Sequence, residues 1–405
     1  MVLVIAFCIL IVLGLDYLFI QRLNISNKSR QRWLYLLVAI DILPQVITQP
    51  FYLFSPDNFA LMGHIARWAM FSFLVLGIAR QPFNIAFLIS RNRWVRAAGA
   101  ICSICAATIF IYGMAVTRTN YIVNHITISS DRLPKSFDGY RVVQLSDLHI
   151  GTMVNATREI GRVVEICNSL DADAITFCGD LIDSRYHEIT PEVAQELKLL
   201  KAHDGIFSIT GNHDIGVYVR DSIRLTPKEN TRRLIAIERR LGWHVLDNQT
   251  EYITRGADSI SITGISFSQS QQENRHSANH SEVKLDSIYN NIPKELFNIS
   301  LSHMPQLWDN IRNVHHADLT LAGHVHAMQI AIKVGQWRIS PSTLLYKRWS
   351  GLYQEGEQYL YINDGIGYGL YPMRIGARPE ITIFELKSTK HHNTAHAENQ
   401  PITNT

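Results

Sequence analysis

The sequence is poor in cysteine and in charge, and it lacks the basic pattern of nucleic-acid-binding proteins. Only 5 of 405 residues are cysteine, 18% are charged, and the formal net charge is +3. So few cysteines call for no disulfide framework, and they leave the redox compartment open. Because no long basic stripe interleaved with aromatic residues runs along the chain, we expect no nucleic-acid partner.

Long apolar runs, in contrast, are abundant in the first 117 residues, while 47% of the whole chain is hydrophobic. Runs of about 20 residues suit membrane spans. We predict about four spans in a transmembrane region at 1–117, namely 2–20, 33–54, 68–89 and 97–116. A cleaved signal peptide is disfavoured, because no basic residues precede the first run and no small-residue cleavage site follows it.

Two charged residues, Asp41 and Arg80, interrupt the middle spans. Charges are costly in lipid, so we expect both to face the interior of the helical bundle or an interface. They either pair with one another or lie near broken helix ends in contact with water.

Charges in the loops predict an orientation. The first and third loops are basic and the second, 55–67, is poor in lysine and arginine; the basic residues are Arg22, Lys28, Arg30, Arg32, Arg91, Arg93 and Arg96. This alternation places the first and third loops in the cytoplasm. We therefore expect an integral protein of a bacterial inner membrane whose N-terminus and C-terminal domain are periplasmic or otherwise extracytoplasmic.

The remainder of the chain resembles a soluble enzyme in its pattern of apolar and polar residues. We predict a linker and first strand at 118–139, an α/β domain at 140–387 and a polar disordered tail at 388–405. Strands alternate with helices up to residue 241, and the density of strands beyond it indicates a second sheet. Predicted helices are 156–170, 191–201 and 226–241, and predicted strands are 140–146, 172–178, 205–210, 244–245, 259–267, 298–302, 319–322, 329–334, 359–362 and 381–386. The polar segment 268–281 is predicted to be a mobile loop.

Carboxylate, imidazole and amide side chains follow several of these strands. They are Asp147, His149, Asp180, Asp183, Asn212, His213, Asp214, His303, His324 and His326. In an open α/β sheet, ligands bind beyond the carboxyl ends of the strands, so we expect these side chains to meet. Carboxylates, imidazoles and an amide oxygen suit Zn, Mn or Fe. For Asp183 and Asp214, a helix cap or the orientation of a metal ligand is the preferred interpretation.

The ordered blocks DLH, GDL, GNHD, SHMP and GHVH resemble the calcineurin-like metallophosphoesterases, over about 140–386. Any single block is a weak signal, but the ordered set is highly specific. The similarity is greatest to the membrane-anchored bacterial branch, whose later GxG and PEI segments correspond to Gly365–Gly367 and Pro379–Ile381. The implied fold is a four-layer α/β/β/α sandwich, preceded here by the transmembrane helical region.

The resemblance also implies a binuclear site with two divalent ions (Mn, Fe or Zn). One ion would be bound by Asp147, His149 and His326, the other by Asn212, His303 and His324, with Asp180 as the bridge. His213 would stabilise the phosphoryl transition state or protonate the leaving oxygen. A metal-bridging hydroxide would attack phosphorus in line.

The activity implied is hydrolysis of a phosphomonoester, phosphodiester or pyrophosphate bond. Anchoring favours a lipid-linked or cell-envelope substrate, and a tether that only retains the enzyme is the other explanation. The alternative function is a membrane scaffold or sensor with a catalytically silent phosphoesterase-like domain, against which the complete ligand set argues. The oligomeric state is not indicated by the sequence.

Two departures from the family pattern concern the substrate pocket. Ala327 and Met328 stand where the family often has Gly-Gly, and Asp364 stands where it often has arginine. Neither change removes a ligand, but bulk at Met328 alters a place where backbone could approach a ligand closely. The cationic and aromatic segment 346–353 is either a substrate or headgroup contact or, as we prefer, a hairpin with ordinary aromatic packing.

The predicted orientation can be tested with reporter fusions. Alkaline phosphatase fused after Leu386 should be active in bacteria, because that enzyme matures only outside the cytoplasm. A fusion within the first loop, after Arg30, should be inactive. A Leu386 fusion active only with a cytoplasmic reporter would reverse the orientation.

Overall fold

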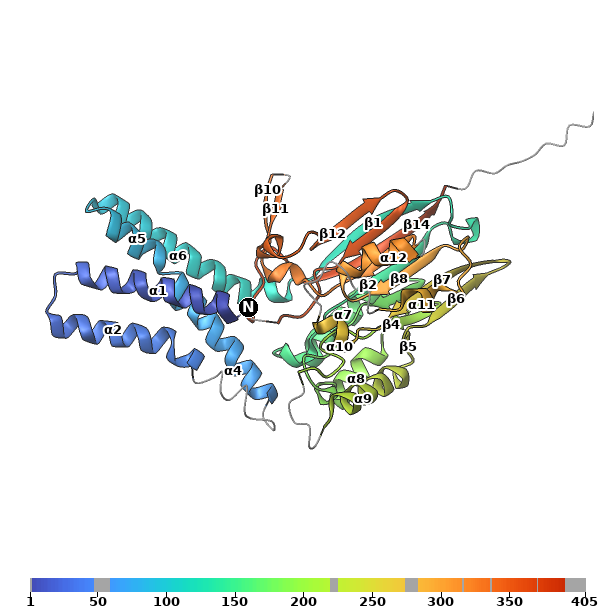
Figure 1. The fold of residues 1–405 in the computed structure, drawn as a ribbon, viewed down its shortest axis with the longest axis horizontal. Helices are drawn as coiled ribbons and strands as arrows, with labels where there is room; N and C mark the ends of the chain where they lie inside the picture. Colours follow the sequence, from blue (N-terminus) through green and yellow to red (C-terminus); the bar gives the residue numbers. More distant parts are fainter. Residues whose placement is uncertain are drawn as a thin grey trace, which may run out of the picture.

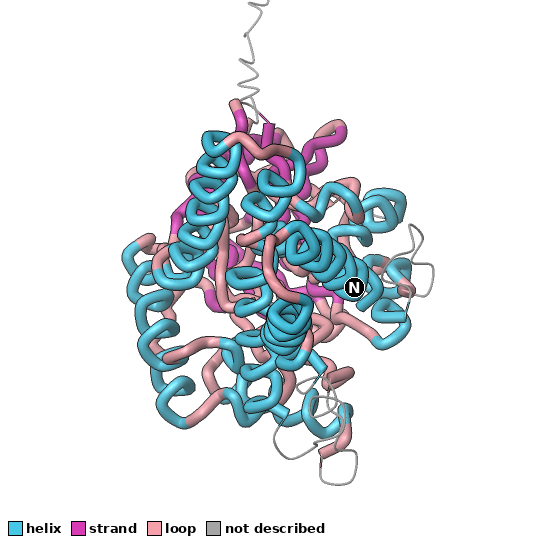
Figure 2. The backbone as a smooth tube through the Cα atoms, turned by 90° about the vertical axis from the view of Figure 1, so that its left-hand side faces the viewer, coloured by secondary structure: helices cyan, strands magenta, loops and turns pink. Residues whose placement is uncertain are grey.

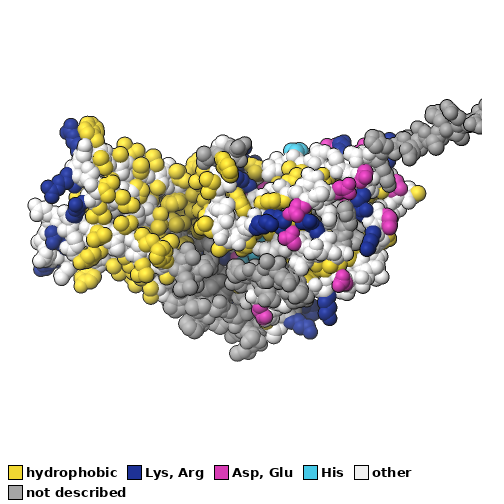
Figure 3. Space-filling model, turned by 45° about the horizontal axis from the view of Figure 1, so that its top comes forward, with side chains coloured by type: hydrophobic (Ala, Val, Ile, Leu, Met, Phe, Trp, Pro, Cys, Tyr) yellow, Lys and Arg dark blue, Asp and Glu magenta, His cyan; other side chains and the backbone are white. Residues whose placement is uncertain are grey.

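The computed structural model describes residues 2–46, 59–218, 225–273, 283–314, 317–335, 337–369 and 371–389. A helical region forms one end of the molecule and an α/β domain the other (Figure 1). When the molecule is turned by 90°, helices stand in front of the strands (Figure 2). Hydrophobic side chains gather over the helical region, and lysines and arginines lie at its end away from the domain (Figure 3).

The helical region begins with long helices. Its elements are α1 (Val2–Arg22), α2 (Asn27–Asp41), α4 (Phe59–Ser72), the π-helix η1 (Phe73–Ile78), α5 (Gln81–Ile89) and α6 (Arg93–Ala115). Within the described residues, Gly63–Ile89 and Arg93–Thr119 are long and apolar enough to cross a membrane. These helices are compatible with the predicted transmembrane region. The end of the predicted second span, 47–54, lies outside the described residues.

A buried ion cluster joins three of these helices. The Arg80 guanidinium donates to Asp16 of α1 and to Asp41 of α2, with N–O distances of 3.1 Å to each Oδ1. Asp16 is 1% exposed and Asp41 is 0% exposed. Asn84 adds a hydrogen bond of 2.7 Å to Asp16 Oδ1. The interrupting charges therefore pair with each other, as one of the two hypotheses held, and Asp16 completes the cluster.

The first sheet of the α/β domain is mainly parallel. Its strand order is β1 (Ile122–Ser130), β14 (Glu380–Ser388), β2 (Tyr140–Leu145), β3 (Ala174–Phe177), β4 (Gly205–Ser208) and β5 (His244–Val245). Helices α7 (Ala156–Ser169), α8 (Pro191–Lys198) and α9 (Pro227–Arg240) contribute to the core on its outer face. Val142 and Val143 are both fully buried and point into different cores, which explains why such strands are continuously apolar.

The second sheet packs against the first. Its order is β12 (Gly351–Glu355), β13 (Gln358–Ile362), β9 (Leu319–Ala322), β8 (Asn298–Ser302), β7 (Asp258–Ile265) and β6 (Thr250–Arg255). Side chains of both sheets share one core cluster, and the short helices α11 (Leu285–Tyr289) and α12 (Trp308–Val314) bury a further cluster. The four-layer sandwich predicted from the sequence is thus confirmed.

The structure departs from the prediction at short or exposed elements. Strand β6 was not predicted, because it is an edge strand and only Ile253 within it is buried. The predicted mobile loop starts instead with the helix α10 (Gln269–Glu273), whose glutamines and glutamate are good helix formers. The strand predicted at 329–334 begins only at β10 (Ile332–Val334), which forms a two-stranded hairpin with β11 (Trp337–Ile339).

The ion cluster predicts a strong effect of Arg80. Arg80→Leu leaves two buried carboxylates without a counter-charge, so we expect a loss of about 3–5 kcal/mol of stability. Denaturant titration of helix content in detergent measures the loss. Arg80→Lys should keep most of the stability, and replacement of the exposed Arg91 by leucine should change little. Equal midpoints for Arg80→Leu and the unaltered protein would contradict the assigned role.

Candidate metal centre

The carboxyl ends of β2, β3, β4, β8 and β9 meet at one edge of the sandwich, because these strands run parallel within their sheets. The loops that follow them bring together all the predicted ligands. Asp147, His149, Asp180, Asn212 and His303 are buried, and His324 and His326 are partly buried.

The first cluster consists of Asp147, His149 and His326, each of which offers an atom within 4.8 Å of the others. His326 Nε2 lies 2.9 Å from Asp147 Oδ1. His149 Nε2 lies 3.2 Å from His326 Nε2. Two imidazole nitrogens and a carboxylate oxygen therefore face a common point.

The second cluster consists of Asp180, His303 and His324, with Asn212 beside them. Asn212 Oδ1 is 2.9 Å from His303 Nε2 and 2.8 Å from His324 Nδ1. His303 Nε2 is also 3.2 Å from Asp180 Oδ2. Oxygen and nitrogen donors again converge.

Asp180 lies between the two clusters. Its Oδ2 atom is 3.2 Å from His303 Nε2 and 3.7 Å from His149 Nε2. The donors fit a pair of divalent cations, because their lone pairs converge on two points and they include two carboxylates. In each cluster two imidazole nitrogens lie 3.2 Å apart, close enough for one cation to take both as ligands.

Burial and neighbouring charges set the protonation of these groups. Burial, together with nearby His213, lowers the pKa of His149 to about 3; burial and nearby His303 lower that of His324 to about 3. Burial opposes ionisation of Asp147, but the adjacent His326 brings its pKa below the usual range. Burial also opposes the charge on His303, yet Asp180 raises its pKa to about 9. Neutral imidazoles and ionised carboxylates are the forms that bind metal; at His303 a cation would replace the proton.

The backbone at the site is strained. Five of the ten non-glycine residues with positive φ in the described part of the chain are predicted ligands, namely Asp147, His149, Asp180, His324 and His326. The left-handed conformation costs such residues about 1–2 kcal/mol each. Strain of this kind concentrates at functional sites, where the surrounding structure maintains it.

The same left-handed path continues through Ala327 and Met328, with φ of 50° and 46°. Glycine adopts these angles without cost. The two departures from the family's Gly-Gly pair therefore have a conformational consequence, in addition to the bulk of the methionine side chain.

Two glycines allow the loops to approach the ligands. A Cβ atom on Gly211 would lie 2.2 Å from Asp180 Oδ1, and one on Gly323 would lie 2.2 Å from Asp147 Oδ2. Neither carboxylate could keep its position against a larger residue. The glycines of the GNHD and GHVH blocks are thus required by packing against the ligand side chains.

His213 lies beside the first cluster. Its ring contacts His149 with ring centroids 4.5 Å apart, and its Nδ1 atom lies 2.5 Å from the Asp183 carbonyl oxygen. Since Nδ1–H donates to that carbonyl, Nε2 is the ring nitrogen left for a substrate. His149, Asp183 and His213 also lie close enough to hold an ion. The hydrogen bond at His213 Nδ1 argues against such a third site.

Asp214 orients backbone around the ligands. Its carboxylate accepts hydrogen bonds from the amides of Asp180, Gly211 and Ile182 at 2.7, 2.8 and 3.2 Å. These contacts agree with the interpretation of Asp214 as a residue that orients a ligand, here through the backbone of Asp180.

One residue near the centre was not anticipated from the sequence. Arg67, on α4 of the helical region, donates from Nη2 to Asp183 Oδ2 at 2.5 Å and from Nε to the Gly369 carbonyl at 2.7 Å. Asp183 Oδ1 in turn lies 3.9 Å from His149 Nδ1 and 3.7 Å from His213 Nδ1. The helical region thus reaches a carboxylate that borders the candidate centre. No local pattern marks Arg67, which is 116 residues from Asp183.

Arg374 was also not anticipated. It is fully buried, and its Nη2 atom lies 3.4 Å from His326 Nδ1. The guanidinium donates from Nη2 to the Gly367 carbonyl at 2.5 Å and from Nη1 to the Asp364 carbonyl at 2.9 Å. It therefore supports the loop that packs against His326.

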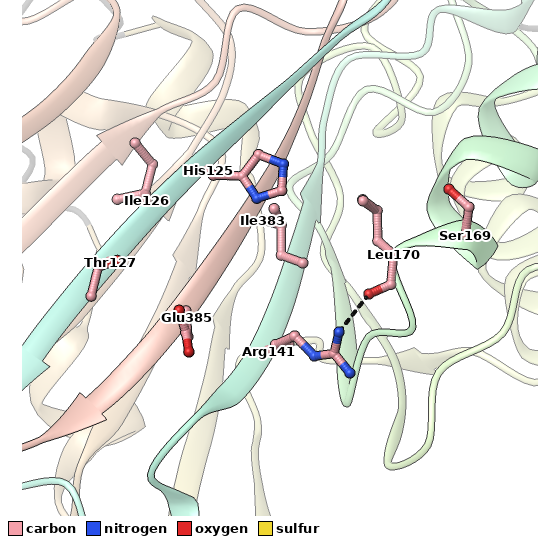
Figure 4. A pocket seen from close by; sticks show the side chains of 8 residues that line it. All are labelled: His125, Ile126, Thr127, Arg141, Ser169, Leu170, Ile383 and Glu385. Atoms are coloured by element: carbon pink, nitrogen blue, oxygen red, sulfur yellow. Dashed lines mark hydrogen bonds between the residues drawn. The ribbon is translucent and has the colours of Figure 1, made fainter.

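A cavity of about 290 Å³ lies elsewhere, over β1, β14 and the start of β2 (Figure 4). Arg141 at its wall donates to the Leu170 carbonyl at 3.3 Å and pairs with Asp171 at 2.7 Å. Arg141 lies near the start of β2, whose other end leads to Asp147, so the cavity is remote from the candidate metal centre.

The segment 346–353 also has a structural role. Arg348 pairs with Asp309 at 2.9 Å and with Glu355, and it stacks over Trp308 at 4.6 Å from the ring centroid. Trp349 is buried. These contacts favour the interpretation as ordinary packing over a headgroup contact.

Comparison with known proteins finds similarity to metallophosphoesterases. The model of the calcineurin-like phosphoesterase family matches residues 140–328. An uncharacterized metallophosphoesterase of Bacillus subtilis, YkuE, is 30% identical over 268 residues, which are 65% of this chain and 84% of the relative. A Danio rerio transmembrane protein with metallophosphoesterase domain is 28% identical over 356 residues, 84% of this chain and 75% of its own. The UDP-2,3-diacylglucosamine pyrophosphatase LpxG of Chlamydia muridarum is 26% identical over 304 residues, which are 62% of this chain and 86% of the relative.

The contact between Arg67 and Asp183 predicts an effect on metal affinity. Arg67→Ala should weaken Mn²⁺ binding by about 10–100-fold, because Asp183 then loses the cation that holds it beside His149. Calorimetric titration of the full chain in detergent measures the change. Arg118→Ala is the matched control, since it removes a similarly shielded pair with Glu159, at 3.1 Å. Equal Mn²⁺ affinity in both variants would contradict a supporting role for Arg67.

Proposed function

This chain belongs to the calcineurin-like phosphoesterase family, and from that premise we propose that it is a membrane-anchored binuclear metallohydrolase of lipid-linked phosphate esters. The family identifies a hydrolase acting on phosphate esters. The observation that carries the finer proposal is the pair of buried donor clusters with Asp180 between them.

In this proposal each cluster holds one divalent ion. Asp147, His149 and His326 would hold one ion, Asn212, His303 and His324 would hold the other, and Asp180 would contribute to both. Two such ions supply Lewis acidity to a phosphoryl group and lower the pKa of a water molecule. Nitrogen and oxygen donors favour Mn, Fe or Zn as the two ions.

His213 has the geometry of a proton donor to the leaving oxygen. Its Nδ1–H is engaged by the Asp183 carbonyl at 2.5 Å, which fixes the ring with Nε2 directed away from that carbonyl. The ring is less buried than that of His149, so a substrate can reach it. In its protonated form His213 would also stabilise the negative charge of the phosphoryl group.

Two observations support a lipid-linked substrate: the name of one relative and the contact between the helical region and the candidate centre. The Chlamydia relative is named for UDP-2,3-diacylglucosamine, a molecule that carries acyl chains beside a pyrophosphate bond. The Arg67–Asp183 contact brings the helical region against the candidate centre. A phosphate ester with a lipid portion can therefore place its acyl chains in the bilayer and its phosphate at the metals.

We further propose that the domain is extracytoplasmic, in the periplasm of a bacterial cell. The α1–α2 and α5–α6 connections lie at the end of the helical region that is away from the domain (Figure 1), and lysines and arginines gather at that end (Figure 3). Positive loops favour the cytoplasm, so the domain would lie on the other side.

The assigned roles predict different losses of metal binding and hydrolysis for two variants. Asp180→Asn should reduce Mn²⁺ below two ions per chain and abolish hydrolysis of bis-p-nitrophenyl phosphate, because both clusters use this carboxylate. His213→Ala should keep both ions and lose about 10²–10⁴-fold in kcat. The loss should be larger for an alkyl phosphate ester than for the p-nitrophenyl ester, whose leaving group needs no proton.

The exposed His203 provides the control, and His203→Ala should match the unaltered protein. Metal analysis by mass spectrometry and steady-state kinetics on the full chain are the measurements. Full activity of Asp180→Asn, or an unaltered protein that hydrolyses no phosphate ester when loaded with Mn²⁺, would refute the proposal.

A further inference from the structure

Exposed apolar side chains of the α/β domain concentrate in one short segment. Beyond residue 120, nine large apolar side chains of the described residues are exposed, and five of them lie between 332 and 345. These five are Ile332, Trp337, Ile339, Leu344 and Leu345. Trp337 is 71% exposed and Leu344 is 85% exposed. Exposed apolar side chains that gather in one segment indicate an interaction surface, whereas singly scattered ones do not.

The hairpin β10–β11 in this segment has one apolar face and one cationic face. Ile332 pairs with Ile339, and Lys333 pairs with Arg338. Because successive side chains of a strand point to opposite sides, Ile332, Trp337 and Ile339 share one face, and Lys333 and Arg338 share the other. Arg338 donates to Asp364 and to Ser350 of the domain. The cationic face is therefore directed at the domain, and the apolar face is turned away from it.

The base of the hairpin is fastened to α6. The amide of Ala331, next to β10, donates to the Ile375 carbonyl at 2.8 Å. The neighbouring Arg374 amide donates to the carbonyl of Gly113 in α6 at 3.2 Å. Gly113 permits this contact, since a Cβ atom there would lie 2.9 Å from the Arg374 oxygen. The hairpin thus stands where an apolar helix meets the domain (Figure 1).

We propose that the apolar face of hairpin β10–β11, with Leu344 and Leu345, docks on the lipid bilayer that the helices enter. The link to α6 sets the depth of the hairpin relative to the bilayer. The base of the hairpin bonds to Ile375, and the neighbouring Arg374 bonds to Gly113, near the domain end of a stretch long enough to cross a membrane. Tryptophan is favoured at the boundary between lipid and water, and an apolar face lying on that boundary binds in proportion to the area it buries.

The location of the hairpin gives the docking a consequence. β10 begins six residues after His326, in the segment that also holds the left-handed turn at Ala327 and Met328. Contact with the bilayer would hold this turn, and the candidate metal centre beside it, close to the membrane surface. Docking itself requires no catalysis, so it can be tested whether or not the proposed substrate is correct.

The test uses the full chain in nanodiscs of phosphatidylcholine and phosphatidylglycerol. Cys8, Cys102 and Cys105 are first replaced by alanine, while the buried Cys167 and Cys178 remain. Trp337→Cys and, separately, Ile339→Cys are labelled with the environment-sensitive dye NBD. Tyr252→Cys, on the exposed edge strand β6, is the matched control.

We expect labels at 337 and 339 to show blue-shifted emission and loss of intensity with nitroxide-bearing lipids, and the label at 252 to show neither. Emission at 337 and 339 as in water, as at 252, would overturn the proposal. A blue shift without quenching by the lipids would also overturn it, because the face would then be covered by protein, such as a second copy of the chain.

Discussion

The structure depends on the convergence of lone-pair donors at the carboxyl ends of parallel strands. Asp147, Asp180 and His303 are almost completely buried there, where water cannot satisfy them. Such a concentration of buried polar groups is tolerated only with partners of opposite character. Asp214 supplies part of the support by accepting three backbone amides. Paired divalent cations are the partners that match the remaining donors.

The cost of this convergence appears in the surrounding backbone. Ligands follow the strands so closely that Asp147, His149 and Asp180 adopt left-handed conformations. Gly211 and Gly323 leave room for carboxylates that any Cβ would displace. At Ala327 and Met328 the chain accepts the same conformation without glycine. The chain after His326 is therefore stiffer and bulkier here than a pair of glycines would make it.

The helical region and the α/β domain are joined by specific contacts as well as by the chain. Arg67 reaches Asp183 beside the candidate centre, and Gly113 bonds to the loop of Arg374, whose side chain supports His326. Both contacts end within reach of the first donor cluster. The orientation of the α/β domain relative to the helical region is thus tied to residues around the candidate metal centre, as the proposed lipid-linked substrate would require.

The sequence by itself determined the alternation of strands and helices, the second sheet and the set of ligand-type residues. Those features follow from local periodicity and from the rule that strand ends share one edge, so they need no knowledge of distant contacts. Only the tertiary structure revealed Arg67 beside Asp183, Asp16 beside Arg80 and the outward face of the hairpin. Each of these contacts depends on which remote segments pack together. The edge strand β6 was missed because only Ile253 within it is buried. Local pattern records the burial of a residue, whereas the identity of its partner is decided by the packing of the whole chain.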